Sequence, residues 1–158
     1  MDVQSRSFPS TSVSPAAAWS GYAGLLPFVA CLLLLLVAPQ QEWRELAQRA
    51  ALAYGAVILS FVGALHWGLA LAGRLPADAR RIGVAVLPAV VATAALLLEG
   101  ARGTGLLIAG FGLFWLYEHR QCSGQLPEDY LALRRTLSLA VCALLTLILF
   151  AADAAGLR

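Results

Sequence analysis

The chain of 158 residues is strongly apolar, with 60% hydrophobic residues, 13% charged residues and a mean hydropathy of +0.77. Soluble domains carry about one quarter charged residues, so this composition predicts a protein surrounded by lipid. All eleven basic residues are arginine, and the net charge of +2 is too small to favour a nucleic-acid partner. The length predicts one compact membrane domain without a second soluble domain.

The amino-terminal residues 1–15 are rich in serine and proline, which predicts a disordered arm. A first membrane span is expected over residues 16–38, where Pro15 suits the helix start and Pro27 predicts a bend. A cleaved signal segment is the alternative. However, the apolar run is longer than a signal core, and Leu36 stands where a small residue should precede cleavage.

Four further apolar stretches predict four more spans. The second, residues 50–72, has 23 residues without a formal charge, enough to cross a hydrocarbon core of about 30 Å. The charged segment 40–49 is expected either to lie on the membrane surface as a short helix or to extend the second span into water. The other spans and a carboxyl-terminal tail are expected at residues 82–98, 103–117, 130–152 and 153–158, respectively.

These spans predict an all-α integral membrane bundle of five transmembrane helices. The segment between the third and fourth spans, residues 99–102, is so short that these two helices must be antiparallel neighbours. With the amino terminus inside, seven arginines fall on inner segments and four on outer segments. Arginine favours the cytoplasmic side, so the amino terminus is expected in the cytoplasm and the carboxyl terminus in the periplasm.

Small residues recur at helical spacing in several spans, and the second span carries the longest series. In lipid this spacing lets two helix backbones approach closely, so that dispersion forces replace the hydrophobic drive that water supplies. We therefore expect the second span to be central in the bundle. The predicted helix-packing residues are Ala56, Ser60, Gly63, Ala64, Gly68 and Ala72 in the second span, with Gly105, Ala109 and Gly112 in the fourth.

His66 is the sharpest candidate for a functional residue, because ionisable side chains inside a span usually face protein or water and mark functional sites. Together with Ser60, Trp67 and Tyr117 it predicts a site for a quinone-like or lipid-like ligand, or for protons. The alternative is a neutral histidine held by a backbone carbonyl, by Ser60 or by Tyr117. Haem held by His66 and His119 is a weaker alternative, because both are expected toward the inner face but His119 lies at the water boundary and axial ligation needs a matched, sheltered pair; no cofactor is therefore predicted.

The other polar residues favour ordinary roles. The segment 118–122 contains one histidine and one cysteine, too few ligands for a zinc centre, and it is expected to be a solvated loop without a metal. Arg134 and Arg135 are expected to bind anionic lipid head groups or to anchor the topology. No nucleophile–base pair, phosphate-binding glycine loop or metalloprotease motif is visible in the sequence, which lowers the expectation of an enzyme without excluding one.

Several blocks of the sequence resemble a family of small membrane proteins of unknown function, the transmembrane protein 69-like family. The strongest likeness is LSFVGALHWGLAL, residues 59–71, within a block that begins at Tyr54. GYAGLLPF, residues 21–28, is a second block, while Leu87-Pro88 and residues 126–136 match more loosely. The resemblance implies a helical bacterial inner-membrane protein with mitochondrial relatives, and it implies no known activity or catalytic residue.

Two functions fit these observations. The first is a non-enzymatic accessory or assembly subunit, whose small-residue faces pack against other membrane subunits or against a second copy of the chain. The second is a binder or carrier of a small lipophilic ligand or of protons near His66. In both cases the lipid bilayer is a partner and nucleic acid is not.

Overall fold

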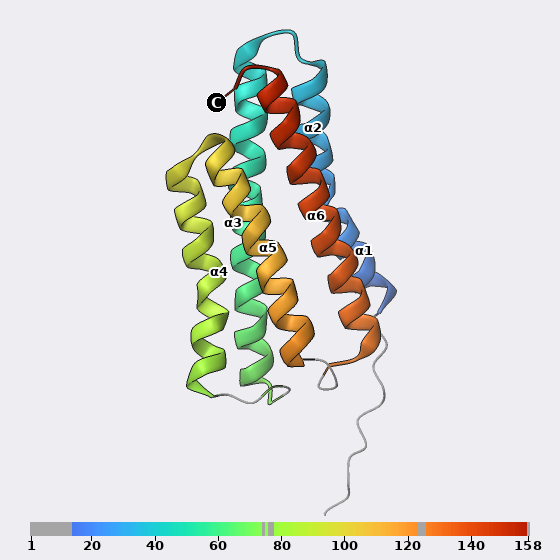
Figure 1. The fold of residues 1–158 in the computed structure, drawn as a ribbon. Coiled ribbons are helices and arrows are strands. Elements are labelled where there is room, and N and C mark those ends of the chain that lie inside the picture. Colours follow the sequence, from blue (N-terminus) through green and yellow to red (C-terminus); the bar gives the residue numbers. More distant parts are fainter. Residues whose placement is uncertain (1–13, 74, 76–77, 123–125, 158) are drawn as a thin grey trace, which may run out of the picture.

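The computed structural model describes residues 14–73, 75, 78–122 and 126–157, and its only regular secondary structure in these segments is helical. Six helices form an elongated bundle, and the consecutive helices α2 to α6 alternate in direction (Figure 1). The predicted all-α fold is confirmed. The helices are α1 (Pro15–Ala23), α2 (Leu26–Val37), α3 (Gln41–Leu71), α4 (Ala79–Leu98), α5 (Gly100–Cys122) and α6 (Glu128–Ala154).

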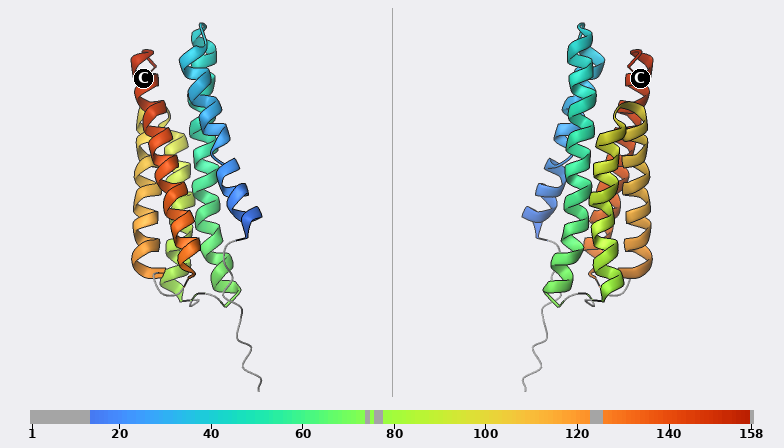
Figure 2. Two further views of the ribbon diagram at one scale, coloured as in Figure 1. Left: turned by 90° about the vertical axis from the view of Figure 1, so that its right-hand side faces the viewer. Right: turned by 90° about the vertical axis from the view of Figure 1, so that its left-hand side faces the viewer.

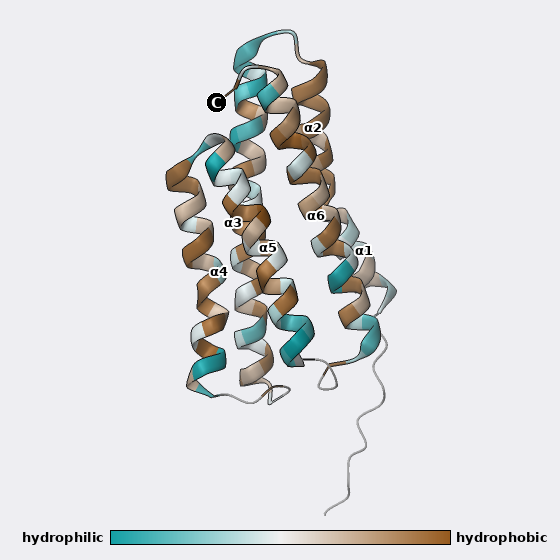
Figure 3. Cartoon of the chain, viewed as in Figure 1, coloured by the Kyte–Doolittle hydropathy of each residue, from teal (hydrophilic) through white to brown (hydrophobic). Residues whose placement is uncertain are grey.

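Four segments among the described residues are long and apolar enough to cross a membrane: Pro15–Val37, α3, α4 and α6. Apolar residues cover most of the length of the bundle and polar residues gather toward its ends (Figure 3). The chain is therefore a multi-pass membrane protein. The fourth predicted span, α5, is not among the four, because its sequence contains Arg102, Glu118, Arg120 and five glycines. It nevertheless packs against α3, α4 and α6.

The first predicted span is bent, as Pro27 predicts, and the bend divides it into two helices. Helix α1 ends before Gly24, and α2 begins after Leu25. The hydroxyl of Tyr54 on α3 donates a hydrogen bond to the Gly24 carbonyl at 3.1 Å, which ties this break to the bundle. Helix α1 leans away from the other helices below the break (Figure 2). The predicted disordered arm lies almost wholly in residues 1–13, outside the described residues.

Helix α3 is the centre of the bundle, as the second span is expected to be. It packs against α2, α4, α5 and α6, and its apolar part is buried to a larger extent than that of the other candidate spans. The charged segment before the predicted span forms the first turns of α3 from Gln41 onward. Of the two alternatives for this segment, the extension of the span is therefore correct and the separate surface helix is not.

The contact between α3 and α4 depends on Gly63. A Cβ atom at this position would lie 2.5 Å from the carbonyl oxygen of Ala85 and 3.0 Å from the ring of Pro88. No larger side chain fits without a movement of the α4 backbone, so the missing side chain sets the distance between the two helices. Of the other predicted packing residues, Ala56 is also buried.

Most of the predicted packing residues do not contribute to contacts of this kind. An added Cβ atom at Gly68, Gly105 or Gly112 would meet no atom within 4 Å. Ala64, Ala72 and Ala109 are exposed, and Ser60 is half-buried. The bundle therefore uses one side of the small-residue pattern of α3 and leaves the other side on its surface.

Two helix ends have unusual backbone conformations: the end of α4, which leads directly into α5, and the end of α6. Glu99 alone separates α4 from α5, so the predicted antiparallel pair is present, and its backbone φ of 51° lies in a region that residues other than glycine rarely occupy. At the end of α6, the N–H of Leu157 donates to the Ala152 carbonyl at 2.9 Å after Gly156, whose φ is 75°. This cap returns Leu157 to the apolar core, so the predicted tail is partly packed.

Candidate functional site

Glu118 is the only charged side chain that is fully buried among the described residues, with 1% of its surface exposed. It lies on the inward face of α5 because it follows Leu107, Phe111 and Phe114 at helical spacing, and these three side chains are also buried. An isolated charge in such a place would cost several kcal/mol of desolvation energy. A carboxylate here therefore requires partners inside the bundle.

Arg134 on α6 supplies the positive charge. Its Nε atom lies 3.4 Å from both Glu118 carboxylate oxygens, and only 13% of the arginine side chain is exposed. The two residues meet because α5 and α6 are antiparallel neighbours and both lie near the segment that joins these helices. The ion pair therefore links α5 to α6 within the bundle.

His66 on α3 is the third member of this group. Its Nε2 atom lies 3.6 Å from Glu118 Oε1, and its Nδ1 atom lies 3.4 Å from the carbonyl oxygen of Val62. The imidazole meets the edge of Phe114 with 4.9 Å between the ring centroids, and the side chain is 7% exposed. We name His66, Glu118 and Arg134 the charged cluster. It joins the three helices α3, α5 and α6.

The two ring nitrogens of His66 both face oxygen acceptors. A neutral imidazole has only one N–H group, so it can donate to Val62 or to Glu118 but not to both. Nδ1 lies within hydrogen-bond distance of the Val62 carbonyl, and Nε2 lies 3.6 Å from the Glu118 carboxylate without another hydrogen-bond partner in the described part of the chain. In either tautomer one ring nitrogen keeps a lone pair that faces an oxygen acceptor, so the imidazole can take up one additional proton.

A narrow pocket lies on one side of the charged cluster. It is lined by His66, Trp67, Arg81 and Tyr117, among others, and has room for about one water molecule. Its walls come from α3, α4, α5 and Leu75 in the α3–α4 connection. The imidazole is therefore the member of the cluster that this pocket reaches.

A larger lateral cleft, named here for its position between α1, α3, α5 and α6, lies on the other side. Its volume is about 550 Å³, within the range of about 300–1,000 Å³ that is common for small-molecule sites. The lining is mainly apolar, and Ala17 and Phe61 on its walls are exposed, so the cleft opens sideways on the surface of the bundle. Arg134 and Ser138 are polar residues of its α6 wall. Arg134 therefore belongs both to the cleft and to the charged cluster.

Residues 13–150 match the family model described as "Protein of unknown function (DUF3429)". The chain belongs to this family. It is also similar to Transmembrane protein 69 of Xenopus tropicalis, with 35% identity over 110 residues that make up 65% of this chain and 41% of that protein. The chain thus spans about two fifths of the length of this relative. The resemblance to transmembrane protein 69-like proteins is confirmed, and no solved structure is significantly similar.

In this DUF3429 protein, three of the four residues predicted to bind a ligand lie together. His66, Trp67 and Tyr117 all line the narrow pocket. Ser60 does not join them, because its hydroxyl donates to the Ala56 carbonyl of its own helix at 2.9 Å. The contact between His66 and the Val62 carbonyl is of the kind that the alternative, structural interpretation of this histidine requires.

The prediction that residues 118–122 form a solvated loop is wrong, because α5 continues through them and Glu118 faces inward. The signal for this was the spacing of 107, 111, 114 and 118, which continues the buried face of the helix by one more turn. His119, one residue later, is exposed and stacks on Trp115 at 5.9 Å between ring centroids. The two histidines of the chain therefore lie in different surroundings.

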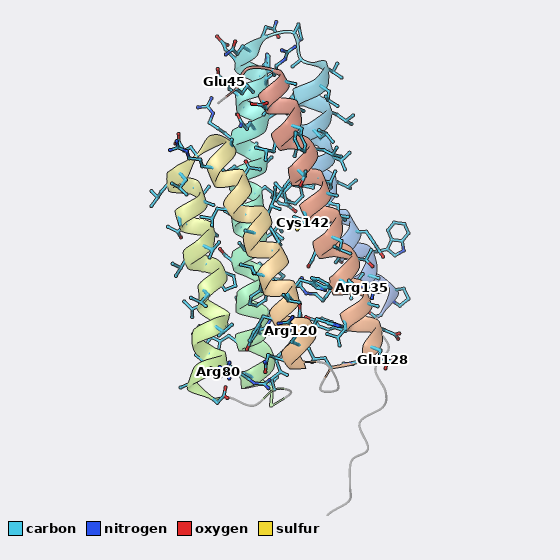
Figure 4. The ribbon with its side chains drawn as sticks, viewed as in Figure 1. Glu45, Arg80, Arg120, Glu128, Arg135 and Cys142 are labelled. Carbon is cyan, nitrogen blue, oxygen red and sulfur yellow. The ribbon has the colours of Figure 1, made fainter. Side chains whose placement is uncertain are left out.

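The two arginines predicted to contact lipid head groups also differ. Arg134 faces Glu118, whereas Arg135 is exposed near the end of the bundle, where Arg80 and Arg120 also lie (Figure 4). Among the described residues, no group of three His, Cys, Asp or Glu side chains is arranged to hold a metal ion. The residues of the charged cluster can supply hydrogen bonds, charge compensation and proton exchange.

Proposed function

We propose that this protein binds a small lipophilic molecule, quinone-like or lipid-like, in the lateral cleft and holds its polar end at Arg134. The observation that carries the proposal is that a buried charged cluster reaches an apolar cleft through one of its members. Ligand sites commonly combine an apolar cavity with a few polar groups, and charged residues inside membrane bundles commonly mark such sites.

The proposed topology has five crossings, including α5, in the bacterial inner membrane. Helix α5 has a low hydropathy, and Glu118 is its most deeply buried charge. Because Glu118 is buried and paired with Arg134, this carboxylate does not face the lipid. The distribution of seven arginines against four supports a cytoplasmic amino terminus and a periplasmic carboxyl terminus. In this orientation the charged cluster lies toward the cytoplasmic side.

In this proposal two parts of the cleft wall bind two parts of the ligand. Apolar side chains such as Ile58, Leu133 and Leu137 contact the hydrocarbon part of the ligand. The guanidinium of Arg134 donates hydrogen bonds to an oxygen of the head group, and such charge-assisted bonds are about twice as strong as neutral ones. Because the cleft opens sideways, the ligand enters from the bilayer without passing through water.

The experiment compares two neighbouring arginines in purified protein reconstituted in nanodiscs. A short-chain quinone and a short-chain fatty acid are titrated, and binding is measured by tryptophan fluorescence or calorimetry. We expect Arg134→Gln to weaken binding about tenfold or more, because a hydrogen bond to a charged group contributes about 1.5–3 kcal/mol. The matched control Arg135→Gln, at an exposed position, should bind as the wild type does.

A second variant guards against a folding defect in Arg134→Gln. Leu133→Trp narrows the cleft without changing charge and should also weaken binding, while the protein still elutes as a single species. Failure of the wild type to bind either amphiphile, or unchanged binding in both variants, would contradict the proposal.

An accessory or assembly subunit is the second candidate, and the unfilled space beside Gly68, Gly105 and Gly112 supports it. These positions allow another helix to approach α3 or α5 closely. Replacing Gly68 or Gly105 by leucine should leave the monomer folded and remove a co-purifying partner in mild detergent. A clean wild-type monomer without partners would count against this candidate.

A further inference from the structure

The charged cluster has a charge balance that a ligand in the lateral cleft would disturb. Arg134 contributes one positive charge, Glu118 one negative charge, and a neutral His66 none. Glu118 lies 3.6 Å from His66 and 3.4 Å from Arg134, in surroundings where charges interact strongly. A net charge on the cluster is therefore costly, and a change at one member is felt by the others.

We propose that the binding of an anionic head group at Arg134 is coupled to the uptake of one proton by His66. This inference rests on the proposed lateral cleft site and names the class of its ligand. An anion from the cleft shares the positive charge of Arg134, which leaves Glu118 without full compensation. A second proton on the His66 ring, whose Nε2 atom lies 3.6 Å from Glu118, restores the balance by forming an imidazolium–carboxylate pair.

Burial of His66 and the two arginines near it favour its neutral form before a ligand arrives. Glu118 on α5 favours an imidazolium, whereas Arg134 on α6 and Arg81 on α4 oppose it, and Tyr117 on α5 lies at the same pocket. On α3 itself the Val62 carbonyl oxygen lies 3.4 Å from Nδ1, the other ring nitrogen. Neutralising one of the two arginines changes this balance in favour of the protonated ring.

Proton and ligand would reach the cluster by different routes. The narrow pocket reaches His66 and has room for about one water molecule, which can deliver a proton. The lateral cleft reaches Arg134, and Glu118 with 1% exposure lies between these two residues in the chain of contacts. In the step itself, hydronium releases a proton to the lone pair of the imidazole and becomes water, and no bond of the ligand forms or breaks.

The test uses dodecanesulfonate below its micellar concentration, because its head group keeps its charge across the pH range in which imidazole titrates. The full chain is placed in nanodiscs of uncharged lipid, and proton uptake is measured by calorimetry in two buffers of different ionisation enthalpy. We expect uptake of about one proton per bound sulfonate near pH 7. Dodecanol, a neutral probe of the same chain length, should cause none.

Variants of the two histidines assign the proton. His66→Gln should bind dodecanesulfonate more weakly and take up no proton, because coupling between two binding events is reciprocal. His119→Gln, at an exposed position outside the site, should behave as the wild type does. If His66→Gln does not fold, ¹⁵N resonances of the two wild-type histidines, assigned with His119→Gln, report the same event as the gain of a second N–H on His66.

Three negative results separate the claims. Binding of dodecanesulfonate to the wild type without proton uptake would overturn the coupling and leave the proposed ligand site in place. A histidine spectrum that does not change on saturation with the sulfonate would overturn it as well. Absence of binding by every amphiphile tested would overturn the proposed function, and the coupling with it.

Discussion

Helix α3 meets its neighbours in two different ways. Toward α4, Gly63 brings the backbones so close that an added Cβ atom would meet the Ala85 carbonyl oxygen and the ring of Pro88. Toward α5 and α6, His66 meets charged side chains, and beyond them lies a cleft of about 550 Å³. The comparison shows that close backbone packing stabilises one contact without polar groups, whereas the charged contact borders space that a ligand can fill.

The largest expected effect comes from breaking the charged contact. Glu118→Leu leaves Arg134 without its countercharge and should lower the free energy of unfolding by about 3–5 kcal/mol. Thermal unfolding in detergent, followed by tryptophan fluorescence, measures this loss. The double variant Glu118→Leu, Arg134→Leu should recover most of the stability, because an apolar pair often replaces a buried ion pair at little cost. A single variant as stable as the wild type would contradict the role of the pair.

The next effect comes from breaking the close contact. Gly63→Leu forces a side chain against the carbonyl oxygen of Ala85 and should destabilise the protein by about 1–3 kcal/mol or more. Gly68→Leu is the matched control in the same helix, because an added Cβ atom there meets nothing within 4 Å. Size-exclusion profiles after a series of heating steps compare the two. Equal tolerance of both substitutions would show that the α3–α4 distance is not fixed at Gly63.

A smaller effect is expected at the edge of the lateral cleft. Tyr54→Phe removes the hydrogen bond to the Gly24 carbonyl and should cost about 0.5–1.5 kcal/mol, with faster hydrogen exchange in α1 than in α4. Tyr22→Phe, at an exposed tyrosine, is the control and should leave exchange unchanged. Exchange that accelerates equally in all helices would mean that Tyr54 supports the whole bundle and not the break between α1 and α2.

The smallest effect is expected at the second histidine. His119→Ala changes an exposed side chain and should alter stability by no more than about 0.5 kcal/mol, while the emission of Trp115 changes because the stacked ring is lost. His66→Ala, by contrast, should be clearly destabilising. Equal stability losses in the two variants would remove the distinction between a buried and an exposed imidazole.

Much of the fold follows from the sequence because apolar length and proline position are local properties. The four apolar spans, the bend at Pro27 and the short connection at Glu99 are all predicted. The helix that the small residues of α3 face is not predicted. A series such as Ala56, Ser60, Ala64 and Gly68 marks one side of a helix but does not show which helix packs there. Burial depends on which helices come together, and that information is distributed over the whole chain.

Part of the site can also be predicted, because some of its features are local in the sequence. His66 stands out because it is alone among apolar residues, and Tyr117 and Trp67 are found with it. The apolar pattern predicts that the fourth span ends at Tyr117, one residue before Glu118, and therefore predicts a loop at this glutamate. Its contact with Arg134 spans 16 residues and forms only when α5 and α6 lie side by side. A buried ion pair between two helices requires tertiary structure to be recognised.

The single residue between α4 and α5 has a consequence for biogenesis. In the five-crossing topology proposed above, Glu99 leaves too little slack for the two helices to enter the bilayer one at a time. In that topology α4 and α5 therefore insert into the bilayer together as one hairpin, in which the strongly apolar α4 offsets the low hydropathy of α5. Because Arg134 lies on α6, the last helix of the chain, the countercharge of Glu118 is synthesised only after this hairpin.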